Sequence, residues 1–453
     1  MTNANAWPTP TVRRLDNGLE IVSVELPHLH TAHAILMLRV GSRFEGEDDG
    51  GLSHLLEHVL FRGCEAHPST WALNTAFEAC STGLDAATSR DYTTFEAAFA
   101  PAELERVLGL LGAMLSKPLL ADVELEKKVI AEELQDEIDS AGEDVDVDNL
   151  AKMALFPGPG FGAKIGGRLE DVAEYTREDC ERWFRRFYGA SNMVLSVAGP
   201  IAADRVHDAA RHALSVLPKG KRQAPPKARR REELPAFEFK SHVASQTEIQ
   251  LAWALPPEPH EDWPALLLAQ RLLDDGSCAR LRHRVVDQLG LAYHASAELE
   301  LYAGLSVLSV ETQTQTKSVL RAIDELLSVV RGLATEPATA EELSRVRGRL
   351  GFELSSVRDS PANVAYWFGL QRLYDGADGL ADRAARLGRV TPEAVQDVAR
   401  RYLDERRMQL TVVGDLTVLD RAALRRRLHR IREQRPPVAV GTNDGPAAAR
   451  LGS

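Results

Sequence analysis

The stretch His54-Leu55-Leu56-Glu57-His58 places two imidazoles and one carboxylate within an otherwise apolar segment. Residues four apart lie on the same face of an α-helix, so His54 and His58 can bind one metal ion from one side. Glu57 precedes the second histidine and can reach a water molecule that the metal polarises. The pattern His-x-x-Glu-His is the inverted form of the helical zinc-protease motif.

A second segment, residues 124–137, carries glutamates at helical spacing. Glu126, Glu133 and Glu137 share one helix face, at separations of seven and four residues. Such a face is most often solvated, but here apolar residues give the helix a buried side, so that a carboxylate at its edge can point inward. A catalytic zinc needs three protein ligands and an open fourth position, which makes Glu133 the candidate for the third ligand. The apolar residues are Val129, Ile130 and Leu134.

Together the two segments resemble the pitrilysin-type (M16, inverzincin) metallopeptidases, the family that includes insulysin and the mitochondrial processing peptidase. In that family a metal-binding glutamate follows the histidine motif at a distance similar to the 75 positions that separate His58 from Glu133 here. Residues 126–134, which read Glu-Lys-Lys-Val-Ile-Ala-Glu-Glu-Leu, fit the family's pattern around that glutamate. The resemblance implies one zinc ion per chain, bound by His54, His58 and Glu133. It also implies that Glu57 is the general base and that Glu126 supports the ligands from behind.

The likeness extends over about residues 10 to 430, and it implies a fold as well as a site. The expected fold is α+β, with two homologous domains that each consist of a mixed β-sheet covered by helices and that face each other around a substrate chamber. Further segments that match the family are Asp16-Asn17-Gly18-Leu19, Gly41-Ser42-Arg43-Phe44-Glu45, Phe61-Arg62-Gly63, Gly83 to Ser89, Ile165-Gly166-Gly167 and Tyr188 to Met193.

An internal duplication supports two domains. The strand-like residues 32–40 correspond to 248–255, and residues 193–199 correspond to 408–414, at offsets of about 215 positions in both cases. Strands alternate with amphipathic helices, which is typical of a sheet covered by helices. The expected helices of the first copy are 51–62, 101–116, 122–138 and 177–187.

The domain boundaries follow from this duplication and from composition. Residues 1–216 are expected to form the zinc domain, and residues 237–435 a metal-free domain of the same kind. A Pro- and Lys/Arg-rich stretch, 217–236, is expected to be the linker, and residues 436–453 a flexible tail. The second domain is expected to be metal-free because the shift of 215 places apolar residues at the motif. They are Ala269, Leu272 and Leu273.

Composition excludes several other classes. At 453 residues, with 44% apolar and 26% charged residues, the chain can bury more than one core. No apolar run is long enough to cross a bilayer, and residues 1–10 lack the basic and apolar regions of a signal peptide, so a cytoplasmic protein without membrane contact is expected. The net charge of -12 argues against nucleic-acid binding and favours cationic substrates. P-loop, GxGxxG and GxSxG motifs are absent from the sequence.

The resemblance also implies how a peptide binds. Family members add the substrate as a strand to a sheet edge near the metal, which reads backbone more than side chains. The matching residues here are Asp85, Ala86, Ala87 and Thr88. The family usually has Asn where this chain has Asp85, and a carboxylate only accepts hydrogen bonds. This difference removes one substrate hydrogen bond or shifts preference toward a basic side chain.

A further departure lies in the second half. Active relatives carry an Arg and a Tyr there, which hold the substrate and stabilise the oxyanion. Residues 285–293 preserve the frame and Tyr293, but Val286 stands where the Arg belongs, and Arg284 is expected to point elsewhere on a helix. The first interpretation is a zinc-bearing subunit of a heterodimer, whose homologous partner lacks the histidine motif and supplies an intact Arg/Tyr pair.

Two alternatives remain. A homodimer or two-domain monomer would work with Tyr293 alone or with another arginine, such as Arg280 or Arg282. A non-catalytic scaffold or partner-binding subunit would keep the metal for stability. Structural zinc sites are closed by four protein ligands and gain nothing from an adjacent free carboxylate. Glu57 therefore favours a metalloendopeptidase that cleaves peptides or small unfolded segments, in which Glu57 accepts a proton from water and returns it to the leaving amine.

Overall fold

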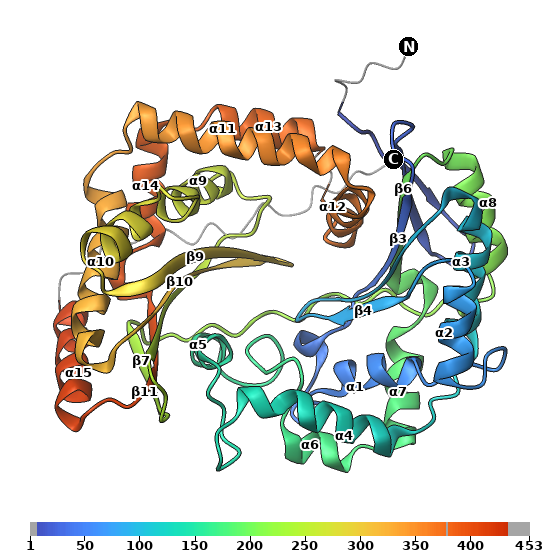
Figure 1. The fold of residues 1–453 in the computed structure, drawn as a ribbon, viewed down its shortest axis with the longest axis horizontal. Helices are drawn as coiled ribbons and strands as arrows, with labels where there is room; N and C mark the ends of the chain where they lie inside the picture. The colour runs from blue at the N-terminus through green and yellow to red at the C-terminus, as the bar shows by residue number, and fades with distance from the viewer. Residues whose placement is uncertain (1–6, 377–378, 434–453) are drawn as a thin grey trace, which may run out of the picture.

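The computed structural model describes residues 7–376 and 379–433. The predicted tail, residues 436–453, lies outside this part of the chain. The described chain contains two β-sheets that stand apart, each with helices packed against it (Figure 1). The α+β class is confirmed. We refer to residues 7–216 as the first half and to residues 237–433 as the second half.

The first half contributes a six-stranded sheet and the second half a five-stranded sheet. The first sheet has the spatial order β1 (Thr11–Arg14), β2 (Glu20–Glu25), β6 (Met193–Gly199), β3 (Ala32–Leu38), β5 (Thr93–Phe99) and β4 (Asp85–Thr88). The second has the order β7 (Ala236–Ser241), β11 (Gln409–Gly414), β8 (Thr247–Leu255), β10 (Leu305–Thr314) and β9 (Ala292–Tyr302). The strands predicted at 32–40 and 248–255 are thus confirmed as β3 and β8.

The two sheets share one topology. In each sheet one pair is parallel, β2 with β6 and β7 with β11, and the pairs from there to the opposite edge are antiparallel. Strand β3 begins at Ala32 and β8 at Thr247, which is 215 positions later. The edge strands β4 and β9 are counterparts in this arrangement. The duplication read from the sequence is therefore a duplication of strand order.

Except for α2, the helices of the first half have counterparts in the second half at offsets near 215 positions. In the first half they are α1 (Leu52–Leu60), α2 (Thr70–Glu78), α3 (Leu104–Ser116), α4 (Val123–Glu133), α5 (Val147–Leu155), α6 (Leu169–Glu174), α7 (Arg177–Phe187) and α8 (Ala203–Leu214). In the second half they are α9 (Trp263–Leu273), α10 (Val319–Thr335), α11 (Ala340–Ser356), α12 (Pro361–Leu373), α13 (Leu380–Gly388), α14 (Pro392–Tyr402) and α15 (Val418–Glu433). Even the caps repeat, because Thr176 accepts a backbone hydrogen bond at the start of α7 and Thr391 does so at the start of α14.

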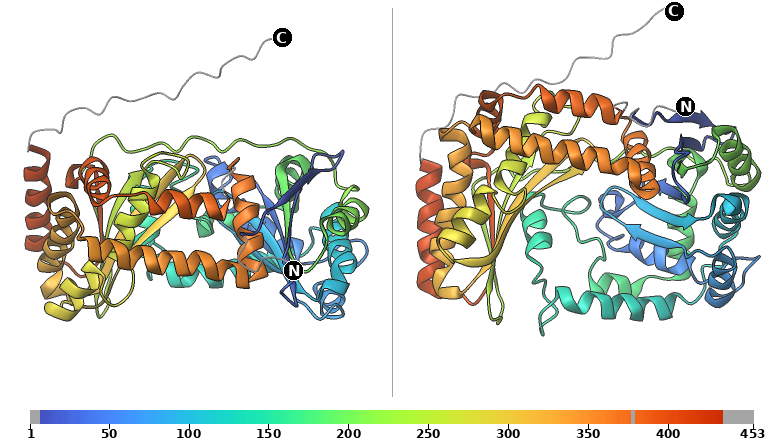
Figure 2. Two further views of the ribbon diagram at one scale, coloured as in Figure 1. Left: turned by 90° about the horizontal axis from the view of Figure 1, so that it is seen from above. Right: turned by 45° about the horizontal axis from the view of Figure 1, so that its top comes forward.

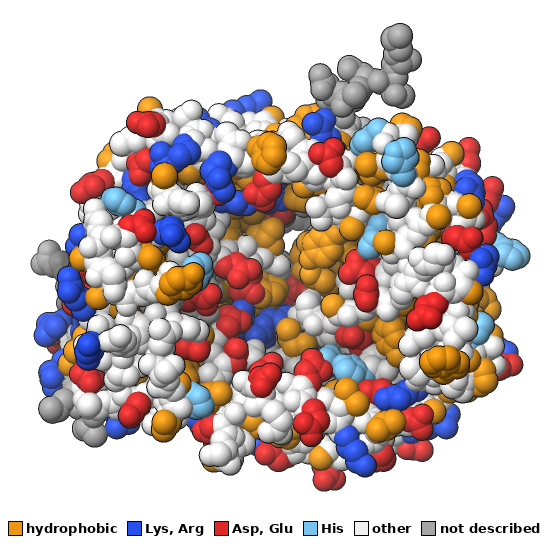
Figure 3. Space-filling view, viewed as in Figure 1, with side chains coloured by type: hydrophobic (Ala, Val, Ile, Leu, Met, Phe, Trp, Pro, Cys, Tyr) orange, Lys and Arg blue, Asp and Glu red, His pale blue; other side chains and the backbone are white. Residues whose placement is uncertain are grey.

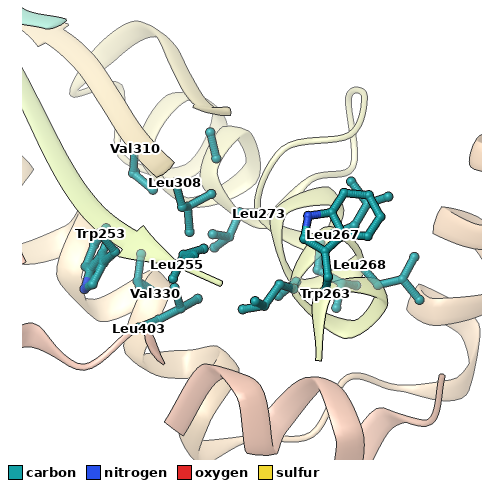
Figure 4. Close-up of a cluster of buried hydrophobic side chains, with 14 of the residues drawn as sticks. Trp253, Leu255, Trp263, Leu267, Leu268, Leu273, Leu308, Val310, Val330 and Leu403 are labelled. Atoms are coloured by element: carbon teal, nitrogen blue, oxygen red, sulfur yellow. The ribbon is translucent and has the colours of Figure 1, made fainter. Parts of the chain in front are cut away.

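The counterpart of the histidine helix carries apolar residues at the three positions that match the motif. Helix α9 lies where α1 lies in the first half, and its residues Ala269, Leu272 and Leu273 are buried at 0%, 3% and 0% exposure. They belong to a core that also contains Trp253 of β8 and Trp263 of α9, drawn in Figure 4. In the second half the positions of the motif residues therefore contribute to core packing.

The halves exchange one helix each. Helix α12 of the second half packs against β2, β3 and β6 of the first sheet, and α5 of the first half packs against β7, β8 and β11 of the second (Figure 1). Gly369 allows α12 to approach closely, since a Cβ there would lie 3.0 Å from Ser196 Cβ and 3.1 Å from Met37 Sδ. The two helices are counterparts under the same offset. Each sheet is therefore completed by a helix from the other half.

A buried ion pair also links the halves. Arg43 Nη1 lies 3.0 Å from Asp91 Oδ1 and 2.7 Å from the carbonyl oxygen of Ala303, at the tip of the β9–β10 hairpin. Tyr374, just after α12, donates its hydroxyl to Asp91 at 3.2 Å. Arg43 and Asp91 are only 4% and 1% exposed. Asp91 thus contacts both the hairpin tip and the residue that follows α12.

Asp91→Asn is expected to destabilise the protein by about 3 kcal/mol, because removing one charge leaves a buried partner charge uncompensated. The matched control is Asp375→Asn, whose pair with Arg222 is exposed and should contribute less than about 1 kcal/mol. Urea unfolding midpoints of both variants measure the difference. Equal midpoints would show that Asp91 acts as an ordinary surface charge.

Residues 215–235, between α8 and β7, form no helix or strand, and they run along one side of both halves (Figure 2). Within the described residues, no helix is both long enough and apolar enough to span a membrane.

Candidate metal centre

Helix α1 is fixed at its start by a carboxylate and by glycine contacts. Glu45 accepts backbone hydrogen bonds from Gly51 and Ser53, both at 2.9 Å, which satisfies N–H groups that the first turn leaves open. Gly51 has φ +83°, and a Cβ there would lie 2.5 Å from the carbonyl oxygen of Gly166. These contacts set the position from which the histidines project.

Three side chains converge beside α1. His54 Nε2 lies 3.2 Å from His58 Nε2 and 3.7 Å from Glu133 Oε1. His58 Nε2 lies 3.6 Å from Glu133 Oε2. One ligand atom from each residue lies within 4.8 Å of the others. The helices α1 and α4 pack together, and this contact brings Glu133 to the two histidines.

The donor set fits a zinc ion. Tetrahedral zinc with ligand distances of about 2.1 Å requires donor atoms about 3.4 Å apart. The two imidazole nitrogens are 3.2 Å apart, and each lies 3.6 or 3.7 Å from a different oxygen of Glu133. Burial, together with the neighbouring His58, lowers the pKa of His54 to about 4, so its imidazole is neutral near pH 7. Neutral imidazoles and a carboxylate are the forms that bind zinc.

A second carboxylate orients His58. Its Nδ1 lies 3.2 Å from Glu126 Oε2, and because a carboxylate only accepts, Nδ1 carries the proton and Nε2 keeps its lone pair. Burial alone would lower the pKa of His58, but the hydrogen bond to Glu126 and the nearby carboxylates raise it. Glu126 also forms an ion pair with Arg62, at the end of α1. This chain of contacts fixes the ring that faces Glu133.

Glu57 lies beside this group and is 8% exposed. Burial and the nearby Glu133 raise its pKa above the usual value, against the lowering effect of the Thr88 hydrogen bond. Thr88, the last residue of β4, donates its hydroxyl to Glu57 Oε2 at 2.6 Å. A carboxylate with a raised pKa is suited to accept and release a proton near neutral pH.

The segment matched to substrate binding forms the edge strand β4, which pairs only with β5. Asp85 and Ala87 are exposed, whereas Ala86 and Thr88 are half-buried. Thr88, at the end of β4, contacts Glu57 through its hydroxyl. An edge strand presents unpaired backbone groups that an extended peptide can join.

Tyr293 does not join this group within the chain. It is 92% exposed and stands at one end of β9, whereas the other end, near Tyr302, adjoins the hairpin tip that contacts Arg43. At about 3.3 Å per residue, the nine steps from Tyr293 to Tyr302 span about 30 Å. Among the described residues, Tyr293 forms no hydrogen bond with Glu57 or with the three converging side chains.

The arginines that are close to Val286 in the sequence form ion pairs with acidic residues of the second half. Arg280 forms a two-pronged ion pair with Glu342 at 2.9 Å, and Arg284 binds Glu325 at 2.7 Å. Arg282 lies 3.9 Å from Asp287. Val286 packs against the second core. Residues Arg282–Gln288 form a π-helix, so the α-helical positions assumed from the sequence do not apply there.

On α4 the sequence reading was partly wrong. Ile130 and Leu134 are buried, but Val129 is 43% exposed and does not contribute to the buried side. The helix expected over 122–138 changes to a 3₁₀ turn after Glu133. Because of this change Glu137 contacts Lys164 and Asn149 and not the histidines.

No role was predicted for Arg62 or Glu45, although both lie in segments that match the family. Arg62 occupies the second position of Phe61-Arg62-Gly63, and Glu45 ends the segment that begins at Gly41. Arg62 follows His58 by four residues, so the two share a face of the helix predicted over 51–62. A positive charge there, close to several glutamates, could have indicated an ion pair behind the histidine. Nothing local indicated that Glu45 would bind the start of α1.

Family models and several known proteins match this chain. Residues 20–156 match the model of the family described as insulinase (peptidase family M16), and residues 174–350 match the one described as peptidase M16 inactive domain. The chain is 28% identical over 404 residues to an uncharacterized zinc protease of Mycobacterium leprae, covering 86% of this chain and 89% of that protein. It is 26% identical to a probable mitochondrial-processing peptidase subunit beta of Schizosaccharomyces pombe, covering 91% and 92%.

Solved structures share the fold. A protease from Helicobacter pylori superposes with a TM-score of 0.83 at 20% identity, covering 90% of this chain and all of that one. A peptidase M16 inactive domain from Pseudomonas fluorescens also has a TM-score of 0.83, at 18% identity, covering 90% and 99%. The duplicated α+β architecture, the two family models and these relatives lead to one conclusion: the chain belongs to the M16 peptidase family, as a short member with two M16 domains.

Proposed function

We propose that the protein is a zinc-dependent endopeptidase. The observation that carries this proposal is the convergence of His54 Nε2, His58 Nε2 and the Glu133 carboxylate within 4.8 Å, with buried Glu57 beside them. Three protein ligands leave a fourth position open, which distinguishes catalytic from structural zinc sites. The Glu133 side chain is 54% exposed, so the group faces solvent on one side.

The residues divide the chemistry among them. His54, His58 and Glu133 hold the metal, which supplies a Lewis acid that activates water near neutral pH. Glu57 accepts the proton from that water and delivers it to the leaving amine. Thr88 holds the Glu57 carboxylate in place through its 2.6 Å hydrogen bond. Glu126 fixes the tautomer of His58.

The substrate is an extended peptide or a small unfolded segment. It pairs with the exposed edge of β4, which leads directly to Glu57. The face shown in Figure 3 is hollowed between the two halves, and acidic side chains gather in the hollow. A chamber between two sheets would admit chains without folded structure and exclude globular proteins.

We further propose that the active assembly contains a second, homologous subunit. Val286 stands where the Arg is expected, and among the described residues Tyr293 forms no hydrogen bond with Glu57 or the three ligands, which supports a partner that supplies these groups. Two relatives, named as a mitochondrial-processing peptidase subunit beta and as cytochrome b-c1 complex subunit 1, are named as subunits of larger assemblies. A heterodimer is the first candidate, and a homodimer is the alternative.

The test is hydrolysis of an unstructured fluorogenic peptide by the zinc-loaded chain alone, with a chelator control. Chelator-sensitive turnover would establish a self-sufficient metallopeptidase, either a monomer or a homodimer, which sedimentation would distinguish. If the chain binds one zinc ion but does not hydrolyse the peptide, the heterodimer is supported. The next step is then to search for a homologous partner. A chain that binds no zinc would overturn the proposal.

Glu126→Gln is expected to weaken zinc binding about tenfold to a hundredfold, which is the usual cost of losing a partner behind a histidine ligand. The amide can still accept from His58 but no longer carries the charge that compensates Arg62. Competition with a chromogenic chelator measures the affinity. An unchanged affinity would show that the His58–Glu126 contact does not support the metal.

Asp85→Asn is expected to reduce the preference for peptides with a basic side chain by a few-fold, because exposed charge pairs contribute less than about 1 kcal/mol. The measurement is the ratio of kcat/KM for two peptides that differ by Lys against Gln near the cleaved bond. Glu78→Gln, an exposed site at the end of α2, is the control. An equal ratio in wild type and Asp85→Asn would exclude a specificity role for Asp85.

A further inference from the structure

A cavity of about 780 Å³ lies where the first half, the second half and the segment between them meet. Arg39, after β3, lines it from the first half, and Tyr374, after α12, lines it from the second. Residues 222–230 contribute the segment between the halves, which runs along one side of the molecule (Figure 2). The residues of the metal centre do not line this cavity.

The cavity carries an excess of positive charge. Two carboxylates line it, and both are already paired, Asp91 with Arg43 and Asp375 with Arg222. Among the residues that the structure describes, no carboxylate lies within 4.0 Å of the remaining cations. These cations are Arg39, Lys227 and Arg230.

Arg39 is the buried member of this group, at 4% exposure. Its Nε donates to the carbonyl oxygen of Leu373 at 3.1 Å and its Nη2 to that of Arg372 at 3.3 Å, at the end of α12. Over residues 7–376 and 379–433, Nη1 has no hydrogen-bond partner. Burial, together with the charge of Arg222, lowers the pKa of Arg39 to about 10. The carboxylates of Asp375 and Glu20 offset this lowering only in part, and an anion in the cavity would compensate the buried charge further.

We propose that this cavity binds a phosphate group, either as inorganic phosphate or as part of a small phosphate ester, through Arg39, Lys227 and Arg230. Three cations without carboxylate partners match a doubly charged anion better than a single carboxylate. Guanidinium groups bind phosphate through two parallel hydrogen bonds. The volume lies in the range of small-molecule sites, and Phe44, Leu255 and Tyr374 provide apolar lining that an organic substituent can contact.

Such a ligand would join parts that are far apart in the chain. It would contact the end of β3 through Arg39 and the segment between the halves through Lys227 and Arg230. Because it binds only the folded arrangement, it stabilises the protein by mass action. Phosphate binding does not involve the residues of the metal centre. Glu57→Gln should therefore bind phosphate as the wild type does.

The experiment is titration calorimetry on the zinc-loaded full chain with sodium phosphate and with AMP, which distinguish the free anion from an ester. Adenosine and sodium chloride at matched ionic strength are the controls. Binding of phosphate, AMP or both, without binding of adenosine, supports the proposal. No binding of either up to millimolar concentration overturns it, as does binding of an N-acetylated dipeptide in their place.

Two neighbouring arginines provide a matched pair of variants. Arg230 lines the cavity and Arg229 does not, and both belong to the same segment without helix or strand, so neither variant should disturb folding. Arg230→Ala should weaken binding about tenfold, the loss of one charge-assisted contact, and Arg229→Ala should leave it unchanged. Equal affinities for the two variants would place the anion elsewhere.

Discussion

Glu57→Gln lowers turnover of an unstructured peptide by about 10² to 10⁴-fold, the contribution of a general acid–base group, and leaves one zinc bound per chain. The amide keeps the size of the side chain and its contact with Thr88 but cannot accept the proton from water. Glu57 is not among the three converging ligands. The expected loss is therefore in kcat, with the metal in place.

The measurement pairs steady-state kinetics in the active assembly with metal analysis of the same samples. Glu65→Gln, just beyond the motif helix and exposed in its pair with Lys117, makes the same chemical change outside the site and should retain full turnover. A Glu57→Gln protein with wild-type kcat would remove Glu57 from the mechanism. A protein that loses its zinc would show that Glu57 binds the metal.

Glu133→Gln is expected to lose more than about a hundredfold in zinc affinity, because even partners behind the ligands contribute tenfold to a hundredfold. The substitution removes the only carboxylate among the three converging residues. Loss of peptide hydrolysis follows from loss of the metal. His58→Ala should have the same result, since it removes one of the two facing imidazoles.

The neighbouring residue gives the control. Glu132 is also exposed on α4 but lies outside the converging group, so Glu132→Gln should bind zinc as the wild type does. Zinc affinity is measured by competition with a chelator, and folding by circular dichroism. If Glu132→Gln loses zinc and Glu133→Gln keeps it, the third ligand has been assigned to the wrong glutamate.

The sequence located the converging residues because their spacing is a local property. Four residues separate His54 and His58 on one helix, so a helix of any orientation keeps them together. Glu133 lies on another helix, and its role came from resemblance to a family pattern, not from periodicity. The offset of about 215 positions predicted two copies of one domain, but it did not predict the strand order within either sheet.

Other features depend on contacts between distant segments and have no local signature. The Thr88–Glu57 hydrogen bond joins an edge strand to α1, and the place of Tyr293 depends on the length and direction of β9. The π-helix at 282–288 changed the expected positions of the arginines. Val129 was assigned to the buried side of α4 because it is apolar, but apolar residues are often exposed when no neighbour covers them.

The exchange of α5 and α12 has a consequence for how the chain holds together when its backbone is cut. Each fragment produced by cleavage within residues 217–235 would carry a helix that completes the sheet of the other fragment. The two pieces would therefore remain associated as a noncovalent complex, because separation would expose the apolar faces of both sheets to water. Conversely, either fragment produced alone would lack part of its own core. The N-terminal fragment, for example, would lack α12, which packs against β3 and covers Ile35 and Met37. The peptide connection between the halves serves to bring them together at high effective concentration, and the crossed helices keep them together afterwards.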